Sequence, residues 1–311
     1  MININKLVFT FLITGIFACT NNSQNKKVET TTIGEITVSC DESLRPIIEA
    51  EEMVFEHLYP KGIINIVYCS EQEAVRMMLH DSARMAIITR ELTKEETLQL
   101  NEQKISHARY FKIGYDAIAF ILNPANRDTI FTRAQVKALL SGEINSWDQL
   151  NKNNSLGKIQ IVFDNPTSGA VRLLQDSVLN GNKLGKTSFA LKSNPDVIKY
   201  VEENKNAIGI IGVSWISDKD DSVVRYFLDN IKVAEIEPVI MRVAGITNKP
   251  IQGNIALKQY PYWRTIIVNS RELKEGLGTG FVSFMGSEPG QKIILKGGLV
   301  PYRSSIRTIV Q

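Results

Sequence analysis

Short apolar runs alternate along this chain with segments whose apolar residues recur at helical spacing. Runs at 34–39, 63–68 and 85–89 end in polar turns and predict strands. Residues 44–59 and 71–80 between them carry apolar side chains on one face and predict helices. Alternation of strands and helices is typical of an α/β fold.

The same alternation continues through the second half of the chain. Further strands are predicted at 113–122, 159–163, 207–213 and 260–268. The segment 113–122 is almost continuously apolar. Thr93 and Glu96 have the spacing of a capping box, which predicts a helix after them. More helices are predicted from 131 to Ser141-Gly142, as one turn at 147–150, and at 272–284 and 288–295.

The first 33 residues differ from the rest. Lys6 is the only charge in residues 1–18, and the apolar run 7–17 is short for a membrane span, so residues 1–18 predict a removed targeting segment. The run ends in Ile16-Phe17-Ala18-Cys19, which resembles a bacterial lipobox with Cys19 as the lipidated first residue. Residues 19–33 then form a flexible, lipid-anchored tether. The alternative is an ordinary secretory peptide that leaves a free cysteine.

The charge balance and the positions of the cysteines and histidines limit the partners, disulfides and metal sites that we expect. The 311 residues hold 36 Lys and Arg against 33 Asp and Glu, without a basic stripe, so we expect no nucleic-acid partner. In an exported protein Cys40 and Cys69 can form a disulfide, or they can be two buried thiols. The three histidines lack metal-ligand spacing, so no metal site is predicted.

A candidate binding site follows the strand at 159–163. The sequence Asp164-Asn-Pro-Thr-Ser168-Gly169-Ala170 forms a polar turn and then opens a helical pattern. The first N–H groups of a helix have no internal partner and attract anions. Ser168 adds a hydroxyl group, and Gly169 lets the backbone approach a ligand closely. The alternative is that Ser168 only caps the helix.

The segment 131–150, with its helix, Ser-Gly turn and Trp147, resembles the second lobe of the phosphate-binding proteins that feed phosphate ABC transporters. Thr89-Arg90-Glu91-Leu92 falls where that family has a Ser-Asp loop, and Thr167-Ser168-Gly169-Ala170 resembles its Ser-Gly-Thr loop. Further similar segments lie at 117–123, 206–209, 260–261 and 290–301, so the resemblance covers about 34–303.

The resemblance implies a two-lobe periplasmic-binding-protein fold of type II, with two crossover strands as the hinge. Lobe 1 would combine 34–116 with 268–311, and lobe 2 would be 119–262. It also implies a monomeric binder of phosphate or a similar oxyanion, outside the cytoplasm, with an ABC permease as partner and neither cofactor nor catalytic group. The implied ligand-binding residues are Ser39, Asp41, Ser43, Thr89, Arg90, Asp164, Ser168, Gly169 and Ala170.

Several positions depart from that family pattern. Asp164 stands where the family has an anion-binding Arg, and Arg90 stands where it has an Asp. We therefore expect Arg90 to bind the anion, and Asp164 to pair with Arg90 or to accept a ligand proton. Ala170 lacks the family's hydroxyl group, and the acid Asp41 replaces a small residue. Arg90 as a surface ion-pair residue, Asp164 as a turn residue and Asp41 as a helix cap remain open.

We consider three candidate functions for this sequence. The first is capture of an oxyanion for transport. The second is a sensor, or an adhesion or assembly protein, that kept the fold and has weak or lost anion binding. The third is an enzyme, which we do not expect because the sequence shows no nucleophile–base pair and no metal cluster.

Overall fold

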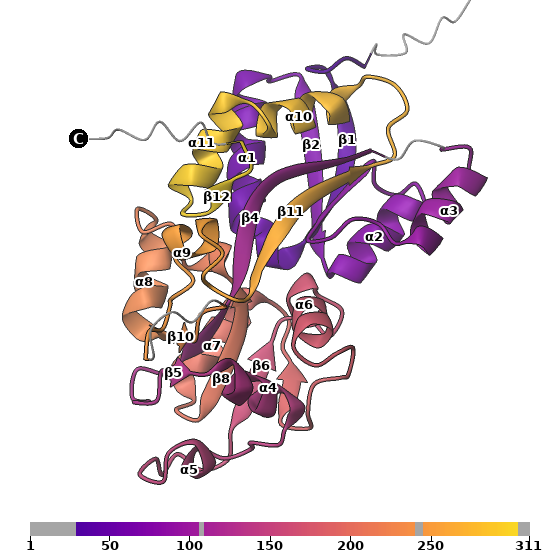
Figure 1. Ribbon diagram of the computed structural model, residues 1–311. Coiled ribbons are helices and arrows are strands. Elements are labelled where there is room, and N and C mark those ends of the chain that lie inside the picture. Colours follow the sequence, from indigo (N-terminus) through magenta and orange to yellow (C-terminus); the bar gives the residue numbers. More distant parts are fainter. Residues whose placement is uncertain (1–28, 106–108, 240–244, 304–311) are drawn as a thin grey trace, which may run out of the picture.

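One long strand connects the two halves of the molecule (Figure 1). The computed structural model describes residues 29–105, 109–239 and 245–303. Strand β4 (Arg109–Leu122) pairs antiparallel with β11 (Trp263–Ser270) as far as Ala117, and with β8 (Ala207–Gly212) from Ile118 onward. The chain therefore passes from one half to the other at this change of partner. The predicted lobe boundaries lie close to it, and they stay a prediction.

The first half is built on strands in the order β2-β1-β3-β11-β4. β1, β2 and β3 are parallel to one another, and β11 runs antiparallel to β3 and β4. In Figure 1 α2 and α3 lie on one side of these strands, and α1, α10 and α11 on the other. The elements are β1 (Gly34–Asp41), η1 (Glu42–Leu44), α1 (Arg45–Leu58), β2 (Gly62–Cys69), α2 (Glu71–Leu79), β3 (Met85–Ile88), α3 (Lys94–Glu102), α10 (Leu277–Met285), α11 (Glu288–Lys296) and β12 (Val300–Pro301).

The second half continues the same sheet in the order β4-β8-β6-β7. β6 is parallel to β8 and β7, and β8 is antiparallel to β4. The elements are β5 (Ile130–Phe131), α4 (Arg133–Ser141), α5 (Trp147–Leu150), β6 (Gln160–Phe163), α6 (Gly169–Ser177), β7 (Ser188–Ala190), α7 (Asn194–Glu203), β8 (Ala207–Gly212), η2 (Val213–Trp215), α8 (Ser222–Asn230), β9 (Lys232–Val233), β10 (Glu235–Ile236) and α9 (Gln252–Ala256).

Capping side chains fix where several helices begin. Thr93 and Thr132 each form a complete capping box, with Glu96 and with Gln135. Ser70 and Ser168 cap α2 and α6 through their hydroxyl oxygens. Because β1, β3 and β6 all end toward the middle of the molecule, the turns that follow them meet there.

Cys40 and Cys69 do not form a disulfide with each other. Cys40 is a buried thiol, and Cys69 is a partly buried one. The register pairs Cys40 with Tyr68 and Asp41 with Cys69. Paired residues of neighbouring strands point to the same face, and successive residues point to opposite faces, so the two thiols lie on opposite faces of the sheet. Of the two alternatives, the free thiols are the ones observed.

One predicted helix begins later than expected. The pattern at 272–284 predicts a helix from Glu272, but α10 begins at Leu277. Glu272 instead accepts a hydrogen bond from the backbone N–H of Thr279 at 2.6 Å and from its hydroxyl group at the same time. Its carboxylate therefore satisfies an unpaired donor in the first turn of α10.

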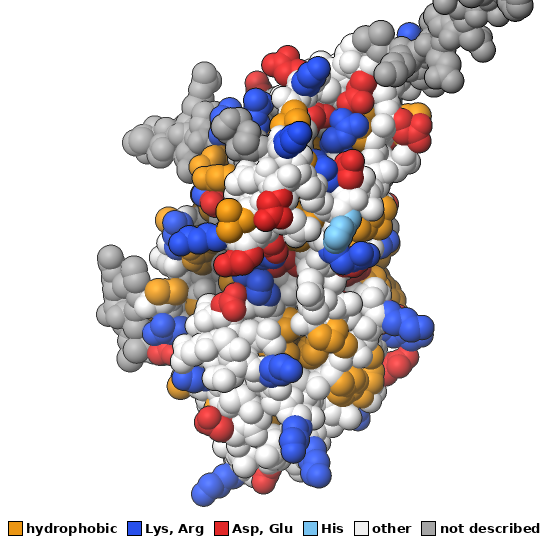
Figure 2. Space-filling view, turned by 90° about the vertical axis from the view of Figure 1, so that its right-hand side faces the viewer, with side chains coloured by type: hydrophobic (Ala, Val, Ile, Leu, Met, Phe, Trp, Pro, Cys, Tyr) orange, Lys and Arg blue, Asp and Glu red, His pale blue; other side chains and the backbone are white. Residues whose placement is uncertain are grey.

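The predicted targeting segment and Cys19 lie outside the described residues, as does most of the tether. None of the helices that the structure describes combines the length and the apolar character needed to cross a bilayer. Acidic and basic side chains are interspersed on the face that lies to the right in Figure 1 (Figure 2). A mixed surface of this kind does not attract a polyanion over a long range.

Candidate functional site

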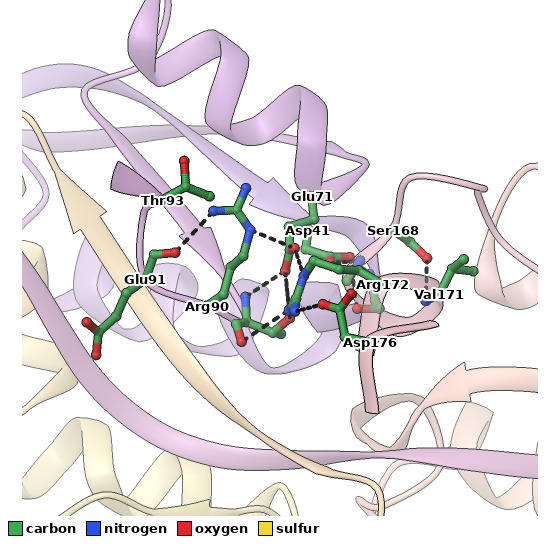
Figure 3. A network of polar contacts seen from close by, with 12 residues as sticks. Asp41, Glu71, Arg90, Glu91, Thr93, Ser168, Val171, Arg172 and Asp176 are labelled. Atoms are coloured by element: carbon green, nitrogen blue, oxygen red, sulfur yellow. Dashed lines mark hydrogen bonds and ion pairs between the residues drawn. The ribbon is translucent and has the colours of Figure 1, made fainter. Parts of the chain in front are cut away.

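The N-terminus of α6 meets the first half of the molecule at the junction between the halves (Figure 3). The Ser168 hydroxyl oxygen accepts a hydrogen bond from the backbone N–H of Val171 at 3.4 Å. The backbone N–H of Gly169 donates to Oδ2 of Asp41 at 2.8 Å, across 128 positions in sequence. A carboxylate therefore occupies the position where the Ser-Gly loop predicts an anion.

Asp41 is held by donors from its own turn. Its Oδ1 accepts from the backbone N–H of Ser43 at 3.0 Å and from the Ser43 hydroxyl group at 2.8 Å. The Ser43 oxygen in turn accepts from Nη2 of Arg264 at 2.8 Å. Burial raises the pKa of Asp41, while the charge of Arg264 acts to lower it. Asp41 is both a cap for η1, as one alternative predicted, and part of the junction.

Glu71 accepts most of the other hydrogen bonds at this junction. Its Oε2 accepts from the backbone N–H of Thr89 at 3.0 Å and from the Thr89 hydroxyl group at 2.6 Å. Arg172, on α6, donates to both oxygens of Glu71 and also reaches Oγ1 of Thr89 at 3.0 Å. Burial acts to raise the pKa of Glu71, but the bonds from Arg172 and Thr89 outweigh it and lower the pKa. Glu71 is therefore a buried, charged carboxylate.

Arg90 lies on the outer side of this network. Its guanidinium donates to both carboxylate oxygens of Glu96, at 2.7 and 2.8 Å, and Nε lies 3.3 Å from Oε1 of Glu71. Among the residues that the structure describes, no ion pair joins Arg90 to Asp164. The predicted pairing of these two residues is therefore wrong, because nearer acids on α2 and α3 satisfy Arg90.

Asp164 follows β6 and is almost fully buried, with 3% of its surface exposed. Its Oδ1 has no hydrogen-bond partner among the described residues. Burial and, after it, the negative charge of Asp41 raise the pKa of Asp164 to about 7. Near neutral pH this carboxyl group therefore exists in both protonation states. Its predicted role as acceptor of a ligand proton stays a prediction.

Two of the predicted residues point away from the junction. The Ser39 hydroxyl group lies 2.7 Å from the carbonyl oxygen of Ala74 and 3.1 Å from that of Met85, so it bonds within the first half. Ser39 is two residues before the end of β1 and faces α2, to which Ala74 belongs. Ala170 is buried, and its methyl group packs in the hydrophobic core. Neither side chain offers a donor to a ligand here.

The sequence pattern did not point to four residues of this network: Glu71, Arg172, Arg264 and Asn194. Asn194 donates to Glu42 and so joins α7 to η1. Arg264 forms a fully buried ion pair with Asp116, at 2.6 and 2.8 Å. Two signals were available: Glu71 follows a strand at the same edge as Asp41, and Arg172 lies one helical turn after Ser168.

The site can bind and orient a polar ligand, with N–H and hydroxyl donors next to carboxylates. Within 29–105, 109–239 and 245–303, no three His, Cys, Asp or Glu side chains are placed to hold a metal ion. The donors come from both halves of the molecule, so a ligand bound by them would join the halves.

Known proteins similar to this chain are phosphate-binding proteins. The phosphate-binding protein PstS of Borreliella burgdorferi is 25% identical over 306 residues, which span 94% of this chain and 96% of that protein. PstS of Staphylococcus aureus strain MRSA252 is 26% identical over 219 residues, 68% of this chain and 61% of that protein.

Among solved structures, a putative phosphate ABC transporter substrate-binding protein from Clostridium perfringens, with bound phosphate, has a TM-score of 0.71 and 25% identity. The match covers 87% of this chain and 100% of that one. An ABC-type phosphate transport receptor from Vibrio cholerae shares the fold, with a TM-score of 0.64 and 21% identity. That match covers 86% of this chain and 100% of the receptor chain. A family model described as the PBP superfamily domain matches residues 25–289. With most of its length matched by that model, this chain belongs to the PBP superfamily.

Proposed function

We propose that this chain is the solute-binding protein of an ABC transporter and captures phosphate, or a similar tetrahedral oxyanion, between its two halves. The observation that carries the proposal is the hydrogen bond from Gly169 N–H to the Asp41 carboxylate. This bond puts a negative group at the N-terminus of α6, where both halves supply donors. The phosphate-binding names of the relatives support the choice of ligand.

The groups at the junction define how phosphate would be held. Gly169 N–H, the Ser168 hydroxyl group and Arg172 would donate to phosphate oxygens. Asp164, with one oxygen unpartnered, would accept a hydrogen bond from a P–OH group. Sulfate carries no proton at neutral pH and would leave that buried acceptor without a donor, so we expect it to bind more weakly.

Calorimetry of the purified protein with phosphate, arsenate, sulfate and molybdate tests the proposal. We expect saturable phosphate binding and a weaker response to sulfate. In Asp164→Asn the difference between phosphate and sulfate should shrink at least tenfold, or about 1.4 kcal/mol, because the amide can donate to either anion. Equal dissociation constants for phosphate and sulfate in the wild type would contradict the acceptor role of Asp164.

The second candidate is a sensor, or an adhesion or assembly protein, with weak or lost anion binding. The buried acids Asp41 and Glu71 and the apolar Ala170 favour it, because acids near an anion lower its affinity. If none of the four anions binds at millimolar concentration, this candidate replaces the first. Phosphate binding together with loss of phosphate uptake in a deletion strain would exclude it.

We also propose that Cys19 becomes the lipidated N-terminus and anchors a monomeric protein to the outside of a bacterial membrane. The apolar run that ends at Cys19 and the polar segment after it support this. Cys19→Ala should release the protein from the membrane fraction. Mass spectrometry that finds an unmodified Cys19, or cleavage at another position, would overturn the proposal.

A further inference from the structure

The strongest donors at the junction are already occupied by acids of the chain itself (Figure 3). Gly169 N–H is bonded to Asp41, and Arg172 is bonded to Glu71. Both contacts cross between the halves, since the two acids lie in the first half and Gly169 and Arg172 lie on α6. The junction thus contains carboxylates in the positions that a bound anion would need.

Glu71 is surrounded by partners from two sides. Thr89 holds its Oε2 from the first half, through both the backbone N–H and the hydroxyl group. Arg172 approaches from the second half as an ion pair and also donates to Thr89 Oγ1 at 3.0 Å. Only 2% of Glu71 is exposed. The Glu71 carboxylate is buried, while 28% of the Arg172 side chain stays exposed, so water and salt weaken this ion pair less than a pair that is exposed on both sides.

The space above Gly169 shows how closely these groups converge. A methyl group built on Gly169 would lie 2.6 Å from Glu71 Oε2 and from Thr89 Oγ1, and closer still to Asp41 Oδ2. Three oxygens therefore surround the first N–H groups of α6. A tetrahedral oxyanion at the same place would present oxygens to the same donors, and it cannot bind there while both carboxylates remain.

We propose that Arg172 is the cation that receives the anion, and that Glu71 is a tethered competitor that occupies Arg172 and holds the halves together until an anion displaces it. This inference rests on the proposed function and adds which residues set the affinity. Asp41 is a second competitor, which occupies the backbone N–H of Gly169 until an anion displaces it. While Glu71 occupies Arg172, a protein molecule cannot bind the anion, so only a fraction of the molecules is competent at any time. The apparent dissociation constant equals the intrinsic dissociation constant divided by that fraction.

The first test compares Glu71→Gln with Glu73→Gln, a matched control on the same helix. Glu73 pairs with Arg76 of the same helix at 2.6 Å, and among the described residues it makes no bond to the second half. Hydrogen exchange is measured without anion on peptides that cover 86–92 and 165–172. We expect Glu71→Gln to exchange faster in both peptides, because Thr89 N–H and Gly169 N–H lose the closed junction, and Glu73→Gln to match the wild type.

Calorimetry with inorganic phosphate gives the second measurement. Glu71→Gln should bind phosphate at least tenfold more tightly than the wild type, because the charged competitor is gone. Without added anion, Arg172→Gln should show the same faster exchange, but it should bind phosphate at least tenfold more weakly. These opposite signs separate a competitor from a receiver, and a purely structural ion pair would weaken binding in both variants.

Unchanged exchange in both peptides of Glu71→Gln would overturn the proposal, and so would weaker phosphate binding by that variant. If neither the wild type nor Glu71→Gln binds phosphate, the proposed function fails while the exchange result still decides whether Glu71 holds the halves together. The two failures are therefore distinguishable.

Discussion

Asp164 shows what burial does to a single residue of the junction. Its pKa is raised to about 7, first by burial and then by Asp41, from an ordinary value of 3.8. Between about pH 4 and pH 7 the folded protein therefore holds a proton that the unfolded chain has lost. Stability then falls as the pH rises through this window, by up to about 4 kcal/mol, since one pKa unit corresponds to about 1.4 kcal/mol.

Asp164→Asn should remove this part of the pH dependence, because the amide does not ionise. We expect the free energy of unfolding of the variant to exceed that of the wild type by a few kcal/mol at pH 8, and the difference to shrink toward zero at about pH 4, near the pKa of the unfolded chain. Urea denaturation of both proteins at the two pH values measures it. Glu51 and Glu52 also have raised pKa values, but they are common to both proteins and cancel in the difference. A difference that does not vary with pH would contradict the prediction.

Gly169 is required for space rather than for backbone conformation. Its backbone is helical, but a Cβ would collide with Asp41, Glu71 and Thr89. We expect Gly169→Ala to keep α6 intact while it forces the halves apart, so that hydrogen exchange in 86–92 and 165–172 rises and phosphate affinity falls at least tenfold.

Gly253→Ala is the control for this substitution. Gly253 also lies in a helix, α9, and a Cβ there would meet no atom within 4 Å. This variant should be slightly more stable than the wild type, by about 0.5–1 kcal/mol, because alanine is the better helix former. If Gly169→Ala behaves like Gly253→Ala, the junction is not closed as tightly as the structure indicates.

At the scale of elements, the sequence predicted those whose signals are local. The strand at 85–89 and the helix that Thr93 and Glu96 introduce are confirmed as β3 and α3, because a short apolar run and a capping box act within a few residues. The turn of Ser141-Gly142 ends α4 with Gly142 at a positive φ of 82°. Helix α7 was missed although Ser193 caps it and Pro195 stands in its first turn, so a local signal was present there too. The bond from its Asn194 to Glu42 of the first half had no such signal.

The features of the candidate site also fall into two groups, those with local signals in the sequence and those that depend on distant contacts. The Ser-Gly loop could be found from the sequence because its cap and helix start are local features. The partners of Arg90 could not be found, because Glu71 and Glu96 compete for it through contacts that only the folded sheet creates. The resemblance to a family drew attention to loops that meet at the junction, among them those of Asp41 and Gly169. It did not show which charges pair, since pairing follows distance in the folded chain.

Helix α1 carries an acid on its buried face. Glu51 is fully buried with Ile47, Ile48 and Phe55, and neither of its oxygens has a partner among the described residues. Burial raises its pKa to about 9, so the group is neutral at pH 7 but still lacks hydrogen bonds. Glu51→Leu should raise the free energy of unfolding by about 1–3 kcal/mol, which is the cost of burying an unpaired polar group.

The exposed Glu49 of the same helix is the control for this change. Glu49→Leu should alter the free energy of unfolding by no more than about 0.5 kcal/mol, because its side chain stays in water. Chemical denaturation at pH 7 compares the two variants with the wild type. A destabilised Glu51→Leu would show that the carboxyl group has a partner that it needs.

At the scale of the whole molecule, one sheet carries both halves and the site lies where it crosses between them. β4 pairs with the first half up to Ala117 and with β8 of the second half from Ile118. Ser214, which follows β8, donates its hydroxyl group to the carbonyl oxygen of Ser43 at 2.9 Å. The crossing point and the turn that holds Asp41 are thereby connected, so a change at the crossing reaches the site.

The buried ion pair at this crossing decides how firmly the halves are joined. Arg264 of β11 faces Asp116 of β4 in register and also donates to Ser43 at 2.8 Å. Arg264→Leu should lower the free energy of unfolding by about 3–5 kcal/mol, because it leaves Asp116 buried without a counter-charge. The double variant Arg264→Leu, Asp116→Leu should recover most of that loss, because no buried charge remains. Urea denaturation of the wild type, each single variant and the double variant measures the coupling, with the exposed Arg76→Leu as control. Equal losses in the single and double variants would show that Arg264 acts through Ser43 and the Asp41 turn rather than through Asp116.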